Sequence, residues 1–137
     1  MKMAGTCPFC RAKTPTSHEE VVKYLRPWVK KKKAWALTLM GKMYRDGEGV
    51  KQSYSMAKRL LEKAAQQGEV RAMIGLGFMY ENGQGVEQSY EKAFEYYEQA
   101  ADLGLATAQF ALGILYANGK GVQIDFAKAR EWWKKAA

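Results

Sequence analysis

Two cysteines near the start of the chain have a spacing with which thiols do chemistry. Cys7 and Cys10 enclose a proline and a phenylalanine in the segment CPFC. Such a pair can cycle between dithiol and disulfide, or it can supply two thiolates to a tetrahedral zinc ion. A redox pair of this kind follows a strand and opens a helix in a βαβ unit, whereas only MKMAGT precedes this one. These surroundings argue against the redox role and leave either part of a zinc site or two reduced thiols in a disordered tail.

A second pattern that could do chemistry is a pair of glycines that recurs three times. YRDGEGV, YENGQGV and YANGKGV begin at Tyr44, Tyr80 and Tyr116, and each copy starts 36 residues after the previous one. A glycine-rich loop can wrap a phosphate, but such a site needs one loop after a strand, with a helix or lysine aimed at the anion. None of the three follows a strand-like run or continues into GK[ST]. Three copies at one period indicate a structural turn that is used three times.

Residues typical of enzyme catalysis are scarce in this chain. His18 is the only histidine, and it lies between Ser17 and Glu20, which fit a helix-capping box. The carboxylates are scattered over predicted helix surfaces, where charged side chains are normally solvated. We therefore predict that the chain is not an enzyme and carries no cofactor of its own.

The period predicts two helices in each unit. Ala36, Met40, Met43 and Tyr44 recur at helical spacing and form one stripe along a first helix. A glycine that stops the first helix and a Ser or Asp that caps the second helix are present in every unit. These positions are Gly47, Gly83 and Gly119 for the stops, and Ser53, Ser89 and Asp125 for the caps. No stretch alternates with a period of two, so we expect no strands.

Each first helix also holds a glycine in its interior, at Gly41, Gly77 and Gly113. A glycine inside a helix costs about 1 kcal/mol relative to alanine. A cost that is repeated at one position of every unit needs a structural reason. We predict that the second helix packs so closely there that a Cβ atom would not fit.

The third unit carries the most complete version of the pattern. Its residues are Ala108, Leu112, Gly113, Tyr116, Gly119, Gly121, Val122, Asp125, Lys128, Ala129, Trp132, Lys135, Ala136 and Ala137. This pattern resembles the Sel1-like repeat family, which is related to the tetratricopeptide repeats. The resemblance covers residues 34–137 and implies an all-α fold, a right-handed α-solenoid of three helix-turn-helix repeats at about 34–68, 69–104 and 105–137. It also implies an adaptor that binds other proteins.

The segment CPFCR, followed by Pro15, resembles the last cysteine pair of a RING-type zinc finger. A RING finger binds two zinc ions with four ligands each, and Cys7 and Cys10 supply only two. We therefore expect the other ligands upstream of Met1, and further repeats downstream, in a longer parent protein that binds zinc. The resemblance implies that the parent recruits a ubiquitin-conjugating enzyme and that the repeats select substrates for a RING-type ubiquitin ligase. Residues 1–16 are the end of this finger or, alternatively, a disordered tail.

The positive charge is concentrated before the repeats. The chain has a formal net charge of +8, and residues 1–36 hold nine basic and two acidic side chains. We expect residues 17–33 to form a lead helix, interrupted at Pro27, and a basic linker that contributes mainly charge, so that its removal leaves the repeats folded. The alternative is that the lead helix is an N-terminal cap that packs on the first repeat through Val21, Val22 and Leu25. The alternative function is a nucleic-acid or membrane-surface binding module through Lys30–Lys33 and its flanking tryptophans.

The sequence shows no targeting or membrane segment. MKMAGTCPFC lacks the apolar region of a signal peptide, and the longest apolar run, around residues 110–117, is too short to cross a bilayer. We expect an intracellular protein of the cytoplasm or nucleus.

A second stripe on the first helices is left over after the core is assigned. By resemblance to tetratricopeptide repeats, this side faces the concave groove and binds a partner protein or peptide. Thr38 belongs to the stripe. Phe78 is the clearest candidate for partner binding, because the aligned Lys42 argues against a core position. The alternative is that Phe78 is partly buried against its neighbouring repeat. The stripe runs from basic to apolar along the chain, which fits a peptide that is acidic at one end and apolar at the other. The predicted partner-binding residues are Trp35, Lys42, Arg45, Arg71, Phe78, Glu81, Phe110 and Ile114.

We predict that the chain by itself does not hold zinc tightly. Two thiolates and the distant His18 leave the coordination shell incomplete, and an incomplete shell loses most of the affinity. Zinc measured after gel filtration against a mild chelator should fall well below one ion per chain. One retained ion per chain would contradict this prediction and would indicate a site completed by dimerisation.

Overall fold

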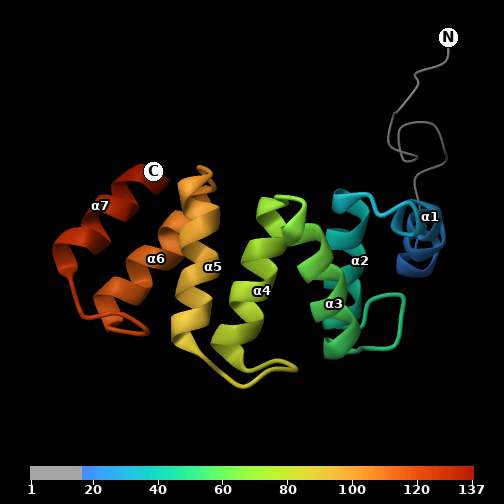
Figure 1. Cartoon of the computed structure of the whole chain (residues 1–137), viewed down its shortest axis with the longest axis horizontal. Helices are drawn as coiled ribbons and strands as arrows, with labels where there is room; N and C mark the ends of the chain where they lie inside the picture. The colour runs from blue at the N-terminus through green and yellow to red at the C-terminus, as the bar shows by residue number, and fades with distance from the viewer. Residues whose placement is uncertain (1–16) are drawn as a thin grey trace, which may run out of the picture.

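The computed structural model describes residues 17–137, which fold into seven helices without any strand (Figure 1). Each helix packs mainly on its neighbours in sequence, so the helices succeed one another along the molecule. This arrangement confirms the predicted all-α solenoid. The helices are α1 (His18–Lys30), α2 (Ala34–Asp46), α3 (Tyr54–Gln66), α4 (Val70–Asn82), α5 (Tyr90–Asp102), α6 (Ala106–Asn118) and α7 (Phe126–Ala136).

The turn within each repeat has the predicted start and stop residues. Gly47, Gly83 and Gly119 end the first helices with φ of 69°, 64° and 66°, a left-handed conformation that only glycine adopts without strain. The predicted caps also form, and the Ser53 hydroxyl accepts a hydrogen bond of 3.3 Å from the backbone N–H of Met56. The glycine pairs are therefore structural turns.

The interior glycines make the predicted close contacts between the two helices of a repeat. A Cβ on Gly41 would lie 2.9 Å from the side chain of Leu61, and a Cβ on Gly77 would lie 2.7 Å from the ring of Tyr97. Gly113 is covered in the same way by Trp133. Leu61, Tyr97 and Trp133 are themselves 36 residues apart, so one large side chain of the second helix fills the space above each glycine.

Helix α1 extends the repeat further toward the N-terminus than the motif suggests. Its bounds lie 36 residues before those of α3, and the Ser17 hydroxyl caps it as that of Ser53 caps α3. Lys32 has φ of 58°, at the position where Gly68 and Gly104 have φ of 86° and 90°. Residues 17–33 therefore have the geometry of the second half of a repeat, although the motif is not recognisable there.

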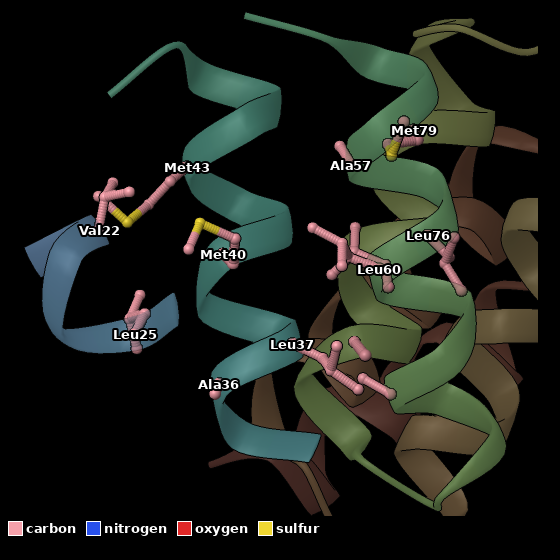
Figure 2. Packing of buried hydrophobic residues seen from close by; sticks show 13 residues of the cluster. Val22, Leu25, Ala36, Leu37, Met40, Met43, Ala57, Leu60, Leu76 and Met79 are labelled. Carbon is pink, nitrogen blue, oxygen red and sulfur yellow. The ribbon is translucent and has the colours of Figure 1, made fainter. Parts of the chain in front are cut away.

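The burial of α1 corrects the expectation that residues 17–33 contribute mainly charge. Val22 and Leu25 are 4% and 0% exposed, and they point toward α2, where Met40 and Met43 lie (Figure 2). Pro27 lies inside α1 and does not interrupt it. Because Pro27 is exposed, water can hydrate the carbonyl that its missing N–H leaves free. Removing this helix would uncover the core of the first repeat.

Two large side chains distinguish α1 from the second helices of the repeats. Ala57 and Ala64 of α3 are fully buried where α2 packs closely on it. The corresponding residues of α1 are Val21 and Trp28, and both are half-buried. The Trp28 ring lies 5.7 Å from that of Trp35 on α2. Helix α1 lacks the small side chains on which a first helix could pack as closely as α2 packs on α3. It therefore acts as a cap that covers α2.

We predict opposite effects for two glycine substitutions in α4. Gly77→Ala should destabilise the fold by about 1–3 kcal/mol, because the new methyl group collides with the Tyr97 ring. Gly75→Ala should be neutral or stabilise by up to about 1 kcal/mol, because alanine is the better helix former and only the tip of Leu61 must move. Ala111 already occupies this place in the third repeat. Denaturant unfolding measures both values, and equal effects would contradict the Tyr97 contact.

Lys32 and Gly68 occupy equivalent left-handed positions at the end of α1 and α3, so we predict opposite effects when each is given the other kind of residue. Lys32→Gly should stabilise the protein by about 0.5 kcal/mol. Glycine removes the strain of the left-handed backbone in the folded state, and this gain is larger than the loss of stability from the greater backbone entropy that glycine gives the unfolded chain. Gly68→Ala should destabilise it by about 1 kcal/mol, although no atom lies within 4 Å of the new methyl group. Thermal and denaturant unfolding test the pair. Stabilisation by Gly68→Ala would show that these two turns do not share one geometry.

Candidate partner-binding surface

Three basic side chains of the predicted stripe lie close together. Lys42 and Arg45 come from α2, and Arg71 comes from the first turn of α4. Partial burial lowers the pKa of Lys42, and the nearby charges of Arg45 and Arg71 lower it further. The carboxylates of Asp46 and Glu69 oppose this effect only in part. The surface therefore holds three neighbouring cations with incomplete neutralisation.

Phe78 lies beside these cations and remains open to solvent. Its side chain is 42% exposed, and the Arg45 guanidinium lies 5.1 Å from the ring centre. Arg45 also pairs with Asp46, with 3.1 Å between Nε and Oδ1. Phe78 is thus partly covered, and the Arg45 that covers one side of its ring belongs to the preceding repeat. The rest of the ring offers an apolar contact next to positive charge.

An acidic residue, Glu81, completes this region, and its charge also affects the buried Tyr97. Glu81 is half-buried, and burial raises the pKa of its carboxyl while the charge of Lys120 opposes the rise. Burial also raises the pKa of the Tyr97 hydroxyl, with Glu81 adding to the shift and Arg45 opposing it. Tyr97 is only 4% exposed and belongs to the core, so it is not part of the surface. We call the following set the α2–α4 surface: Lys42, Arg45, Arg71, Phe78 and Glu81.

The other predicted stripe residues lie elsewhere. Trp35 packs against Trp28 at the junction with α1. Phe110 lies on α6 with its ring 6.4 Å from that of Trp133, and Ile114 is one turn further along the same helix. Both side chains are exposed, at 55% and 38%. They form a separate apolar patch on the third repeat.

Thr38 was placed on the wrong side of its helix. It is 5% exposed, and its hydroxyl donates a hydrogen bond of 2.9 Å to the carbonyl of Ala34. The next residue, Leu39, faces solvent instead and is 36% exposed. The aligned Ile74 is half-buried and Phe110 is exposed, so burial at this position decreases along the array. We infer that the first helix of the next repeat covers this position, since α2 contacts α4 directly.

The lysine run forms the turn between α1 and α2. Lys30 ends α1, and Lys33 precedes α2 as its N-cap residue. The backbone carbonyl of Lys32 accepts a hydrogen bond of 2.9 Å from the Gln67 side chain, and the Lys31 ammonium lies 5.1 Å from the Trp28 ring centre. The run is therefore part of an ordered junction whose side chains remain exposed.

The remaining predictions concern metals and membranes. Cys7 and Cys10 lie outside the described residues. Within residues 17–137, no group of three or more His, Cys, Asp or Glu side chains is arranged to hold a metal ion. No helix of the same region is long and apolar enough to cross a membrane.

The α2–α4 surface is suited to binding. Its donors are a lysine and two arginines, its apolar contact is one phenylalanine, and its carboxyl is half-buried on the adjacent turn of α4. Basic and apolar groups side by side recognise a segment that carries both carboxylates and an apolar side chain.

The comparison with family models identifies the repeat. The Sel1 repeat model matches residues 36–69, 70–105 and 106–137. These three matches follow one another along the chain, and each covers all or most of one first helix and one second helix. Sel1 repeat proteins generally act as scaffolds for protein–protein interaction, which agrees with the prediction that the chain is not an enzyme.

Solved structures of similar proteins share this fold. A protective antigen of uropathogenic Escherichia coli with an SLR fold is 31% identical, with a TM-score of 0.81, and the match covers 90% of this chain and 26% of the antigen. A Sel1 repeat protein from Oxalobacter formigenes is 26% identical, with a TM-score of 0.83, covering 90% of this chain and 50% of that one. Cysteine-rich protein B of Helicobacter pylori is 26% identical, with a TM-score of 0.67, covering 85% and 88%.

The array is short beside the first two of these proteins, because it spans about a quarter of one and half of the other. No curated protein matches the sequence significantly. The family match nevertheless covers more than half of the chain, and the helix pairs, turn glycines and interior glycines fit it. The chain therefore belongs to the Sel1 repeat family.

Proposed function

We propose that the chain binds a partner protein through the α2–α4 surface and that the bound segment joins acidic to apolar side chains. The observation that carries this proposal is the crowding of Lys42, Arg45 and Arg71 beside the exposed ring of Phe78. Burial lowers the pKa of Lys42, and the charges of Arg45 and Arg71 lower it further, so a carboxylate that arrives beside these groups stabilises the charged form of Lys42. Phe78 supplies the apolar contact that fixes the register of the segment.

The distribution of charge gives the bound segment a direction. The cations lie on α2 and at the start of α4, whereas Glu81 lies in the last turn of α4. A segment whose carboxylates face α2 therefore keeps them away from Glu81 and places its apolar residues at Phe78. The apolar patch of Phe110 and Ile114 lies on the following first helix and extends this side of the array.

A finer prediction concerns the parent protein. It states that the repeats select substrates for a RING-type ubiquitin ligase that binds zinc and a ubiquitin-conjugating enzyme. It depends on the CPFCR segment alone, which lies before the described residues. It stays a prediction, and the zinc measurement on a longer protein would decide it.

The alternative function, nucleic-acid or membrane-surface binding through Lys30–Lys33, also stays a prediction. The flanking tryptophans pack on each other at 5.7 Å, and Lys31 covers the Trp28 ring. Rings in this position have less surface for stacking on bases. We therefore favour the protein-binding function.

The proposal predicts a specific pattern of affinity loss. Peptides that bind the full chain are first selected from a displayed library of random dodecamers, and we expect carboxylates next to an aromatic or aliphatic residue. Arg45→Glu combined with Phe78→Ala should then weaken binding by about a hundredfold, because both the charge contact and the apolar contact are lost. Fluorescence anisotropy measures the affinity.

The matched control combines Arg130→Glu with Phe126→Ala on α7, which makes the same changes at exposed residues of another helix. It should leave the affinity unchanged. Circular dichroism confirms that both variants keep their helices. Equal affinities of the Arg45–Phe78 variant and the unaltered chain would refute the α2–α4 surface and place the site on other helices or on the turns.

A further inference from the structure

A groove lies on a different part of the molecule, between α1 and α3. Met40 of α2 and Met56 and Leu60 of α3 are among its apolar lining residues, and Arg26 and Lys30 of α1 stand along one side. Its volume is about 250 Å³. This is smaller than the 300–1,000 Å³ or so of pockets that enclose small molecules. The groove therefore has room for one or two side chains of a peptide.

The two cations of the groove lack a partner within the described chain. Arg26 and Lys30 are both exposed, and they are one helical turn apart, so they share one side of α1. The ion pairs found within residues 17–137 belong to His18, Arg45 and Lys58. None of these pairs neutralises the groove cations. The groove thus combines an apolar floor with a wall of positive charge.

The next repeat provides an internal comparison, because the same groove recurs between α3 and α5. Glu62 and Gln66 stand there in place of the two cations. Tyr96 lines this second groove in place of Leu60, and its ring stacks on that of Tyr80 at 5.8 Å. The two grooves have the same arrangement of helices, so they differ only in their side chains. The first groove is lined by cations and flexible methionines, and the second by Glu62, Gln66 and a stacked tyrosine. Only the first groove joins positive charge to adaptable methionines.

We propose that the groove between α1 and α3 binds a peptide segment of a partner protein, in which a large apolar side chain enters between Met40, Met56 and Leu60 while neighbouring carboxylates pair with Arg26 and Lys30. Charge complementarity selects this occupant. Residues 1–16 of the chain itself contain no Asp or Glu, so they do not supply the carboxylates. This site uses α1, α3 and Met40 of α2, and it shares no residue with the α2–α4 surface.

The proposal explains why α1 differs from the second helices that it resembles. Its cap function needs Val22 and Leu25, which face the core. Arg26 and Lys30 are not required for that contact, since both side chains are exposed. The capping helix thus adds a charged wall to a groove whose floor is built by the first repeat.

Methyl signals of ¹³C-labelled methionines in the full chain provide the test. The probe is the peptide Gly-Ser-Glu-Leu-Glu-Glu-Leu-Glu-Ser-Gly, and a second probe has serine in place of both leucines. Titration with the first probe should shift the Met40 and Met56 signals in a saturable way and leave the Met79 signal unchanged. The second probe should bind at least about tenfold more weakly, because it cannot fill the apolar floor.

Two double variants separate local from general attraction. Arg26→Glu with Lys30→Glu should weaken binding of the first probe by about tenfold or more. Arg130→Glu with Lys134→Glu makes the same change in net charge on two exposed residues one turn apart on α7, and it should have little effect. Equal losses in the two variants would show attraction by net charge only and would overturn the proposal.

The remaining outcomes distinguish this groove from other sites and occupants. In the variant that combines Arg45→Glu with Phe78→Ala, the Met40 and Met56 shifts should persist even though the α2–α4 surface is disabled. Their loss would assign the binding to that surface. Shifts that appear without peptide as the protein concentration rises would assign the groove to a second copy of the chain. Either result overturns the proposal.

Discussion

Close contact between a glycine of the first helix and a large side chain of the second helix is the constraint on which the array depends. Gly41, Gly77 and Gly113 leave room that Leu61, Tyr97 and Trp133 fill. This contact sets the distance and the rotation between the two helices of each repeat. Because the outer sides of the helices follow from that rotation, the same contact determines which residues reach solvent on α2 and α4. The proposed binding surface is therefore a consequence of the core packing.

A second set of glycines joins one repeat to the next. Gly49 and Gly121 approach the backbone of His18 and Tyr90, and Gly85 approaches the side chain of Tyr54. All three partners open the preceding second helix. Helix α1 takes part in this scheme through His18, although only its geometry and not its sequence resembles a repeat. Its role as a cap and its charged outer side are separate properties, and they are carried by different residues.

Much of this fold could be predicted from the sequence, because the period of 36 residues places glycines, caps and alanines at fixed positions. The core role of α1 could be given only as an alternative, because Val21 and Trp28 stand where the repeats have alanine. The candidate surface was predicted in part. Helical spacing indicated Lys42 and Phe78, but it could not separate Thr38 from Leu39, which differ by a rotation of only one residue. Burial by the adjacent repeat decides between them, and sequence periodicity does not report it.

Photo-cross-linking tests the central claim most directly. A selected acidic and apolar peptide that carries a benzophenone group at its apolar residue is bound to the full chain and irradiated, and mass spectrometry maps the modified residues. We expect cross-links at Phe78 and its neighbours on α4, with α2 modified when the group is moved to the acidic end. Cross-links confined to the turns or to α5 and α7 would contradict the α2–α4 surface as the site of partner binding.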